Sequence, residues 1–158
     1  MSGSATEDVT VSTDAARLDL EVIHGFLSRS YWAAGIRREV VERAVRHSLC
    51  FGAYEGARQI GFARVVTDRA TFAYVSDVFV LPDGRGRGVG KQLMAAIMAH
   101  PELQGLRRFT LVTRDAHGLY RQFGFGPPRH PERQMEILMN PYAPGDTSAD
   151  TLTAGAAR

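Results

Sequence analysis

The feature that most constrains the fold of this chain is a glycine-rich, cationic loop between an apolar strand and an amphipathic helix. It occupies residues 80–91, and its sequence is Val-Leu-Pro-Asp-Gly-Arg-Gly-Arg-Gly-Val-Gly-Lys. Four glycines leave the backbone amides bare, and a helix that begins near Gly88 adds the positive end of its dipole. Together with Arg85, Arg87 and Lys91, these groups predict a pyrophosphate site at a strand-to-helix junction.

Two common phosphate-binding motifs do not fit this loop. A P-loop requires Gly, four residues, Gly, Lys and then Ser or Thr, but Arg85 occupies the first glycine position and Gln92 the hydroxyl position. The dinucleotide fingerprint Gly-x-Gly-x-x-Gly ends on Val89 when it starts at Gly84, and it also fails when it starts two residues later. The loop therefore serves another kind of phosphate ligand.

What does fit is the pattern Arg85-x-x-Gly88-x-Gly90, preceded by the strand end Val78-Phe79-Val80. Downstream, a buried strand is followed by a short helix with Leu119-Tyr120 and then by Gly124-Phe125. With these two segments in this order and a predicted helix between them, the chain resembles the GCN5-related N-acetyltransferases (GNAT family). The resemblance covers residues 8–140.

The resemblance implies an α/β fold with a mixed, mostly antiparallel sheet of six to seven strands, flanked by about four helices. The hydrophobic pattern agrees, because it predicts an antiparallel hairpin half and a βαβ half that meet at the loop. An open sheet leaves a crevice for a ligand at such a junction. Strands are predicted at 9–12, 49–54, 59–66, 72–80, 109–113 and 134–139, and helices at 15–29, from 36, at 88–99 and at 115–123.

The resemblance also implies acetyl-CoA as the co-substrate of an acetyltransferase. In this family the strand before the loop splays from its neighbour, so that its backbone binds the pantetheine arm and the loop binds the pyrophosphate. The implied cofactor-binding residues are Val78, Phe79, Val80, Arg85, Gly86, Arg87, Gly88, Val89, Gly90, Lys91 and Thr113.

Two residues are candidates for catalysis. The resemblance implies that Tyr120 protonates the departing thiolate, and a phenol is a suitable acid for that step; its helical spacing with Leu119 and Phe123 equally fits a core residue. Asp77 is implied as the base that deprotonates the acceptor ammonium, directly or through water. Alternatively, Asp77 caps a kink in its strand or pairs with an arginine.

Three further positions bear on the site. Tyr31 and Trp32 match the place where the family has walls of the acceptor pocket, although an aromatic clip between helices fits them equally well. Thr113 stands where the family commonly has asparagine, seven residues before the helix tyrosine. Its hydroxyl can contact the pantetheine or cap the following helix.

Composition excludes several other classes of protein. The 158 residues fit one domain at 8–140, with a loose start at 1–7 and a disordered tail at 141–158. Net charge is only +2 and three cations lie in the loop, which argues against a nucleic-acid partner. Cys50, the single cysteine, is predicted to be a core residue, and no ligand spacing indicates a metal. Without a membrane span or secretory signal, the chain is expected to be cytoplasmic.

The leading hypothesis is therefore an N-acetyltransferase whose amine acceptor, a small molecule or a peptide, attacks the thioester directly. One alternative is a non-catalytic acyl-CoA-binding regulatory module with the same loop. Another is a protein that binds a partner through the Tyr31-Trp32 surface. A homodimer is common among proteins of the resembled family.

Overall fold

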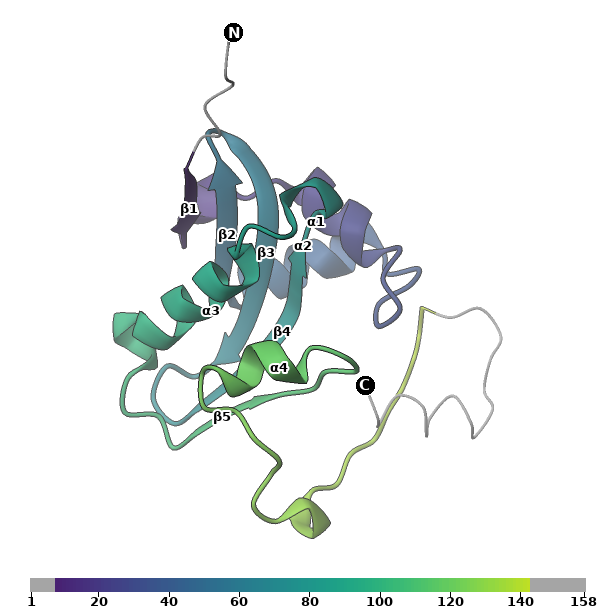
Figure 1. Cartoon of the computed structure of the whole chain (residues 1–158). Helices are drawn as coiled ribbons and strands as arrows, with labels where there is room; N and C mark the ends of the chain where they lie inside the picture. Colours follow the sequence, from purple (N-terminus) through teal and green to yellow (C-terminus); the bar gives the residue numbers. More distant parts are fainter. Residues whose placement is uncertain (1–7, 143–158) are drawn as a thin grey trace, which may run out of the picture.

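The computed structural model describes residues 8–142, so the predictions for 1–7 and 143–158 lie outside the described chain. It shows a five-stranded sheet in which the strands follow the order of the sequence (Figure 1). The first four strands pair antiparallel, and the last joins its neighbour in parallel. The mixed, mostly antiparallel sheet is as predicted, but the described residues form five strands and not six to seven. The strands are β1 Val9–Ser12, β2 Leu49–Glu55, β3 Arg58–Thr67, β4 Phe72–Val80 and β5 Arg108–Leu111.

Helices cover both faces of the sheet. In Figure 1, α3 (Val89–Ala99) and α4 (His117–Arg121) lie in front of the sheet, and α1 (Leu20–Leu27) and α2 (Arg38–Arg46) lie behind it. Each pair of helices closes a separate hydrophobic cluster. Because α3 connects the parallel strands β4 and β5, the predicted βαβ half is confirmed.

Alternation along the strands divides the core between the two faces. Phe51 belongs to the cluster beneath α3, whereas its neighbour Cys50 belongs to the cluster beneath α1 and α2, together with Phe62 and Phe79. The prediction that Cys50 is a core residue is confirmed, and burial raises the pKa of its thiol to about 12.

Capping changes two of the predicted helices. The helix predicted at 15–29 is divided into a 3-10 turn, Ala15–Arg17, and α1, because the Asp19 carboxylate accepts the Glu21 backbone N–H at 3.0 Å and so starts a new helix. The helix predicted at 115–123 is shorter, since α4 begins only after the Thr113 hydroxyl accepts the Ala116 N–H at 3.0 Å.

The strand predicted at 134–139 is not formed. These residues belong to no strand of the sheet, and Met135, Ile137 and Met139 are exposed. An alternating pattern shows that a segment can be a strand, but a strand also needs a neighbour that takes up its backbone hydrogen bonds.

Candidate active site

A bulge in β4 shapes the centre of the site. On β3, Phe62 pairs with Phe79, but Arg64 pairs with Ser76, so β4 carries the extra residue. Asp77, which lies in the bulge, has a φ of 53°, in the left-handed region that non-glycine residues rarely adopt. Bulges bend a strand and redirect its side chains, and they are common beside functional sites.

Beyond this bulge, β4 separates from β5. The parallel pairing is limited to Phe72–Val75 of β4, which lie against Arg108–Leu111 of β5. From Ser76 to Val80, no described strand pairs with this side of β4, so the predicted splay is confirmed. The side chain of Phe79 is buried against Phe26, with ring centroids 4.1 Å apart. The backbone of β4 is therefore what this stretch offers to a ligand.

The glycine loop follows a 3-10 turn, Pro82–Gly84, and ends at Gly88, the N-cap of α3. Gly86 and Gly88 have φ values of 78° and 75°. A Cβ atom built on either glycine would meet nothing within 4 Å. The requirement for glycine is thus set by the backbone conformation, and the surface of the loop is open to a ligand.

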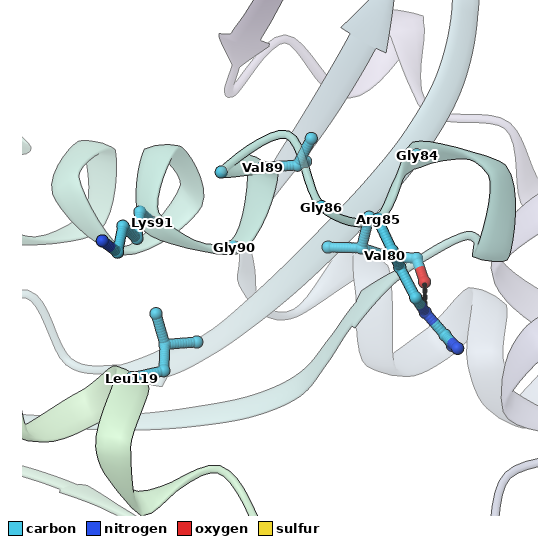
Figure 2. Close-up of a pocket in the computed structure, with 9 residues that line it drawn as sticks. Val80, Gly84, Arg85, Gly86, Val89, Gly90, Lys91 and Leu119 are labelled. Carbon is cyan, nitrogen blue, oxygen red and sulfur yellow. Dashed lines mark hydrogen bonds between the residues drawn. The ribbon is translucent and has the colours of Figure 1, made fainter.

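The loop, the end of β4 and α4 enclose a hollow of about 370 Å³ (Figure 2). Leu119 points from α4 toward the first turn of α3, where its Cδ2 lies 3.4 Å from the place of a Cβ on Gly90. Nine residues line the hollow, and the sequence predicted all of them as cofactor-binding residues except Gly84 and Leu119. The lining residues are Val80, Gly84, Arg85, Gly86, Gly88, Val89, Gly90, Lys91 and Leu119.

The cations of the loop differ in their surroundings. Arg85 donates from Nε to the Val80 carbonyl oxygen at 3.1 Å, as Figure 2 shows. Arg87 forms an ion pair with Glu55 at the end of β2 and does not line the hollow. Lys91 is exposed on the first turn of α3. The positive charge beside the hollow is therefore supplied by Arg85, Lys91 and the N-terminus of α3.

Tyr120 is buried on α4, next in sequence to Leu119, with its ring edge-on to Phe125 at 6.1 Å between centroids. Burial raises the pKa of its phenol to about 12, and Tyr31 and Asp115 contribute to the rise. The prediction that Tyr120 is a core residue is confirmed, while Leu119 and not Tyr120 lines the hollow, so the role of Tyr120 as an acid stays a prediction.

Asp77 is held from two sides. Its Oδ1 accepts a hydrogen bond from Nε1 of Trp32 at 2.9 Å, and its Oδ2 accepts one from Nε of Arg64 at 2.7 Å. The side chains of Asp77 and Arg64 are only 11% and 18% exposed. Arg64 also donates to the Ser48 hydroxyl at 3.2 Å. Both structural alternatives for Asp77, a kink in the strand and an arginine partner, are thus present.

The aromatic pair lies between the two catalytic candidates. Tyr31 and Trp32 meet edge to face with ring centroids 5.0 Å apart. Trp32 is bonded to Asp77, and Tyr31 is close enough to Tyr120 to affect its pKa. The guanidinium of Arg114 stacks on the Tyr31 ring at 3.8 Å. Trp32 also remains exposed, so one side of the pair can serve as a wall for an acceptor.

Sequence reasoning missed two arginines of this site, Arg64 and Arg114. Arg64 had a detectable signal, because it is the only charged residue in the otherwise apolar run 60–66, and a charge buried in a strand needs a partner. Its partner Asp77 is thirteen positions away in sequence. Arg114 follows β5 in a polar stretch and had no comparable signal.

Two negative observations concern the described chain. Within residues 8–142, no group of three or more His, Cys, Asp or Glu side chains is arranged to hold a metal ion. None of the helices in the same range is long and apolar enough to cross a membrane.

A mixed sheet that opens beside a glycine loop at a helix N-terminus defines an α/β protein suited to a phosphorylated ligand. The chain belongs to the GNAT acetyltransferase family, whose domain matches residues 46–127. A candidate acetyltransferase of Gibberella zeae is 33% identical over 72% of this chain and 76% of its own length.

Solved structures agree with this family. A candidate GNAT acetyltransferase from Xanthomonas campestris pv. campestris is 55% identical, with a TM-score of 0.83 over 86% of this chain and 96% of its own. A candidate acetyltransferase from Clostridium acetobutylicum, whose structure was solved with acetyl-CoA, shares the fold at 13% identity, with a TM-score of 0.59 over 83% of this chain and 95% of its own.

Proposed function

We propose that this protein transfers an acetyl group from acetyl-CoA to an amine. The observation that carries the proposal is the open edge of β4, from Ser76 to Val80, which leads directly into the hollow at the glycine loop. An extended chain such as pantetheine can pair with the backbone of an open strand, and the pyrophosphate fits the bare amides at the start of α3. Gly86 and Gly88 leave room for this approach.

Acetyl-CoA supplies the acetyl group as a thioester. The neutral acceptor amine forms a bond from its nitrogen to the acetyl carbon, the bond from that carbon to sulfur breaks, and the excess proton on nitrogen passes to solvent. A thiol has an ordinary pKa of about 8.5. Because the phenol of Tyr120 stays protonated far above neutral pH, it can donate a hydrogen bond to the sulfur as negative charge develops there. Its pKa lies above that of the thiol, so transfer of the proton to the departing thiolate is completed only as solvent returns a proton to the phenolate.

Tyr31 and Trp32 form the proposed wall of the acceptor site, and Asp77 holds Trp32 in place. Both oxygens of the Asp77 carboxylate already accept hydrogen bonds, one of them from a cation. This arrangement favours a positioning role for Asp77 over proton abstraction. The two roles differ in the Asp77→Asn variant: a base leaves a changed pH profile of kcat, whereas a positioning residue chiefly raises KM for the acceptor.

The test begins with calorimetric titration of the protein by acetyl-CoA and by acetyl-pantetheine, which lacks the pyrophosphate. We expect binding in the micromolar range that weakens at least tenfold with the truncated ligand. A panel of amines is then screened for CoA release. If acetyl-CoA binds but none of the amines causes CoA release, the acyl-CoA-binding module is favoured. If acetyl-CoA does not bind, the proposal is refuted.

A pair of tyrosine variants tests the acid. Tyr120→Phe is expected to lower kcat at least tenfold while acetyl-CoA still binds. Tyr54→Phe is the matched control, because Tyr54 is also buried and its hydroxyl has no hydrogen-bond partner among the described residues. Equal kcat values for the two variants would exclude Tyr120 as the acid.

A further inference from the structure

The aromatic pair of the proposed acceptor wall lies where two connections of the fold meet. Tyr31 and Trp32 belong to the connection between α1 and α2, and Arg114 belongs to the one between β5 and α4. In Figure 1 these connections approach each other, and the guanidinium of Arg114 stacks on the Tyr31 ring at 3.8 Å. Trp32 contacts the same ring, with centroids 5.0 Å apart. An acceptor bound here meets an indole and a guanidinium that are supported by one tyrosine.

The indole of Trp32 is held by several contacts and yet partly exposed. Its Nε1 donates to Asp77 at 2.9 Å, and its ring also lies near the ring of Phe26, with centroids 6.1 Å apart. The residue is still 37% exposed. A fixed, partly exposed indole is a suitable surface for an aromatic ligand, because two rings attract each other when they stack with an offset or meet edge to face.

The carboxylates near this wall are already paired with arginines. Asp77 is paired with the largely buried Arg64 and accepts hydrogen bonds at both oxygens. Asp115 is paired with Arg114 at 3.7 Å. Glu136 is exposed and acts on the part of β4 that precedes the bulge. Among the described residues, the wall is therefore not next to a buried carboxylate that is left over for an ammonium group.

This pairing bears on which amines can react. Only a neutral amine attacks a thioester, and an alkylamine is protonated at neutral pH because its pKa is about 10. Binding its ammonium group and removing the proton require a carboxylate that is free to do so. The nitrogen of an arylamine is uncharged at neutral pH, because its lone pair is delocalised into the ring. It is also a weaker nucleophile, so its reaction depends on a rigid surface that positions the ring.

Arg114 adds a site for an anion beside the ring surface. Its side chain is 54% exposed, and its ion pair with Asp115 is too long for a hydrogen bond. The face of the guanidinium lies on the Tyr31 ring, and Asp115 does not occupy the N–H groups on its edge. A guanidinium in this arrangement binds a carboxylate through two parallel hydrogen bonds.

We propose that the acceptor is an arylamine with a carboxylate group, whose ring stacks on Trp32 and whose carboxylate binds Arg114. This acceptor class rests on the acetyl transfer proposed above. The amine nitrogen forms a bond to the acetyl carbon and releases one proton to solvent, the bond from that carbon to sulfur breaks, and the thiolate takes up one proton as CoA leaves. Aminobenzoates are the simplest compounds of this class.

A comparison of related compounds separates the two features of the acceptor. CoA release by the wild type is measured at neutral pH with ortho-, meta- and para-aminobenzoate. For the best isomer, the corresponding aminobenzamide removes the negative charge, and the corresponding aminomethylbenzoate replaces the arylamine by an alkylamine. We expect kcat/KM for the aminobenzoate to be at least tenfold higher than for either compound. If no aminobenzoate is acetylated, or if the best one reacts no better than both others, the proposal is overturned.

An arginine variant tests the carboxylate contact. Arg114→Gln is expected to raise KM for the aminobenzoate at least tenfold, with a much smaller effect on KM for the aminobenzamide, which has no charge to lose. Arg129→Gln is the matched control, because it removes an exposed arginine of the connection after α4 and should leave both KM values unchanged. An equal KM for the aminobenzoate in the two variants contradicts the proposal. The comparison of compounds on the wild type holds even if a variant fails to fold.

Calorimetric titration with acetyl-CoA distinguishes failure of the acceptor class from failure of acetyl transfer itself. If acetyl-CoA binds and the aminomethylbenzoate is acetylated at least as fast as the aminobenzoate, the protein is an acetyltransferase for another class of amine, and only the arylamine proposal is overturned. If acetyl-CoA does not bind, the proposed function and the acceptor class are both overturned.

Discussion

The left-handed conformation of Gly88 makes a measurable prediction for Gly88→Ala. A Cβ at this position meets nothing within 4 Å, so the cost of the substitution comes from the backbone alone. An alanine held in the left-handed region costs about 1–2 kcal/mol. Part of this, about 0.4–1 kcal/mol, is offset because alanine restricts the unfolded chain. The expected net loss in the free energy of unfolding is about 1 kcal/mol, or roughly 2–4 °C in Tm for a chain of this size.

Gly118→Ala is the matched control. Gly118 is exposed within α4, its φ is not positive, and a Cβ there also meets nothing within 4 Å. In a helix, alanine is favoured over glycine by about 0.5–1 kcal/mol, so this variant should be more stable than the wild type. Gly88→Asn should lie between Gly88→Ala and the wild type, because asparagine tolerates the left-handed region better than alanine does.

Urea unfolding of the four proteins, without and with saturating acetyl-CoA, measures these differences. The reasoning also predicts a second effect: acetyl-CoA should stabilise Gly88→Ala less than it stabilises Gly118→Ala, because the loop amides must keep their orientation to bind the pyrophosphate. If Gly88→Ala is as stable as Gly118→Ala, the left-handed conformation does not control the loop, and the explanation of its glycines is wrong.

Three further predictions concern buried groups. Arg64→Leu leaves the carboxylate of Asp77 without its cation and should lower the free energy of unfolding by about 2–4 kcal/mol, with a smaller loss for Arg64→Lys; equal losses in urea titrations would contradict a charge effect. Since the pKa of Tyr120 is about 12, the rate of acetyl transfer should not decrease with an apparent pKa near 10 as the pH is raised. A decrease near pH 10 would mean that the phenol of Tyr120 is exposed to solvent and not buried. Burial raises the pKa of Cys50 from 9.0 to about 12, so the stability that the protonated thiol contributes is complete below pH 9 and is lost as the pH rises from 9 toward 12. Cys50→Ala should make this decline less steep, by at most about 1.4 kcal/mol per pH unit. Measuring the free energy of unfolding of both proteins at about pH 8 and about pH 10.5 checks this.

The parts of this fold that the sequence predicted depend on short-range patterns. The strand, glycine loop and helix around 72–99 are marked by alternation, glycine placement and helical spacing within a few residues of one another. Their parallel continuation into β5 follows from the crossover through a helix. The hollow at the glycine loop could therefore be located from the sequence, and the structure adds only Gly84 and Leu119 to its lining.

The parts that the sequence did not predict depend on pairings between distant residues. Arg87 was expected at the phosphate site, but the register of β2 also brings Glu55 to it. The bond from Trp32 to Asp77 joins residues 45 positions apart, and it exists only because α1 packs across β4. In the same way, the alternation at 134–139 is a local signal, whereas the strand that would pair with it is not specified locally.

Asp77 connects both halves of the site, and its backbone and side chain can be separated by substitution. The backbone of Asp77 is in the left-handed conformation, in the bulge where β4 separates from β5. Its carboxylate accepts hydrogen bonds from Trp32 and Arg64. Asp77→Gly permits the bulge but removes the side chain, whereas Asp77→Ala removes the side chain and adds a strain of about 1–2 kcal/mol. Both should raise KM for the acceptor, because Trp32 loses its hydrogen bond.

Only Asp77→Ala should also weaken acetyl-CoA binding, since it alone disfavours the bulge that exposes the edge of β4. The fluorescence of Trp32, the single tryptophan of the chain, reports the loss of the hydrogen bond in both variants, and calorimetry reports the affinity for acetyl-CoA. Equal acetyl-CoA affinities for the glycine and alanine variants would mean that the backbone of Asp77 does not shape the cofactor edge. The acceptor wall and the cofactor edge would then be independent features of β4.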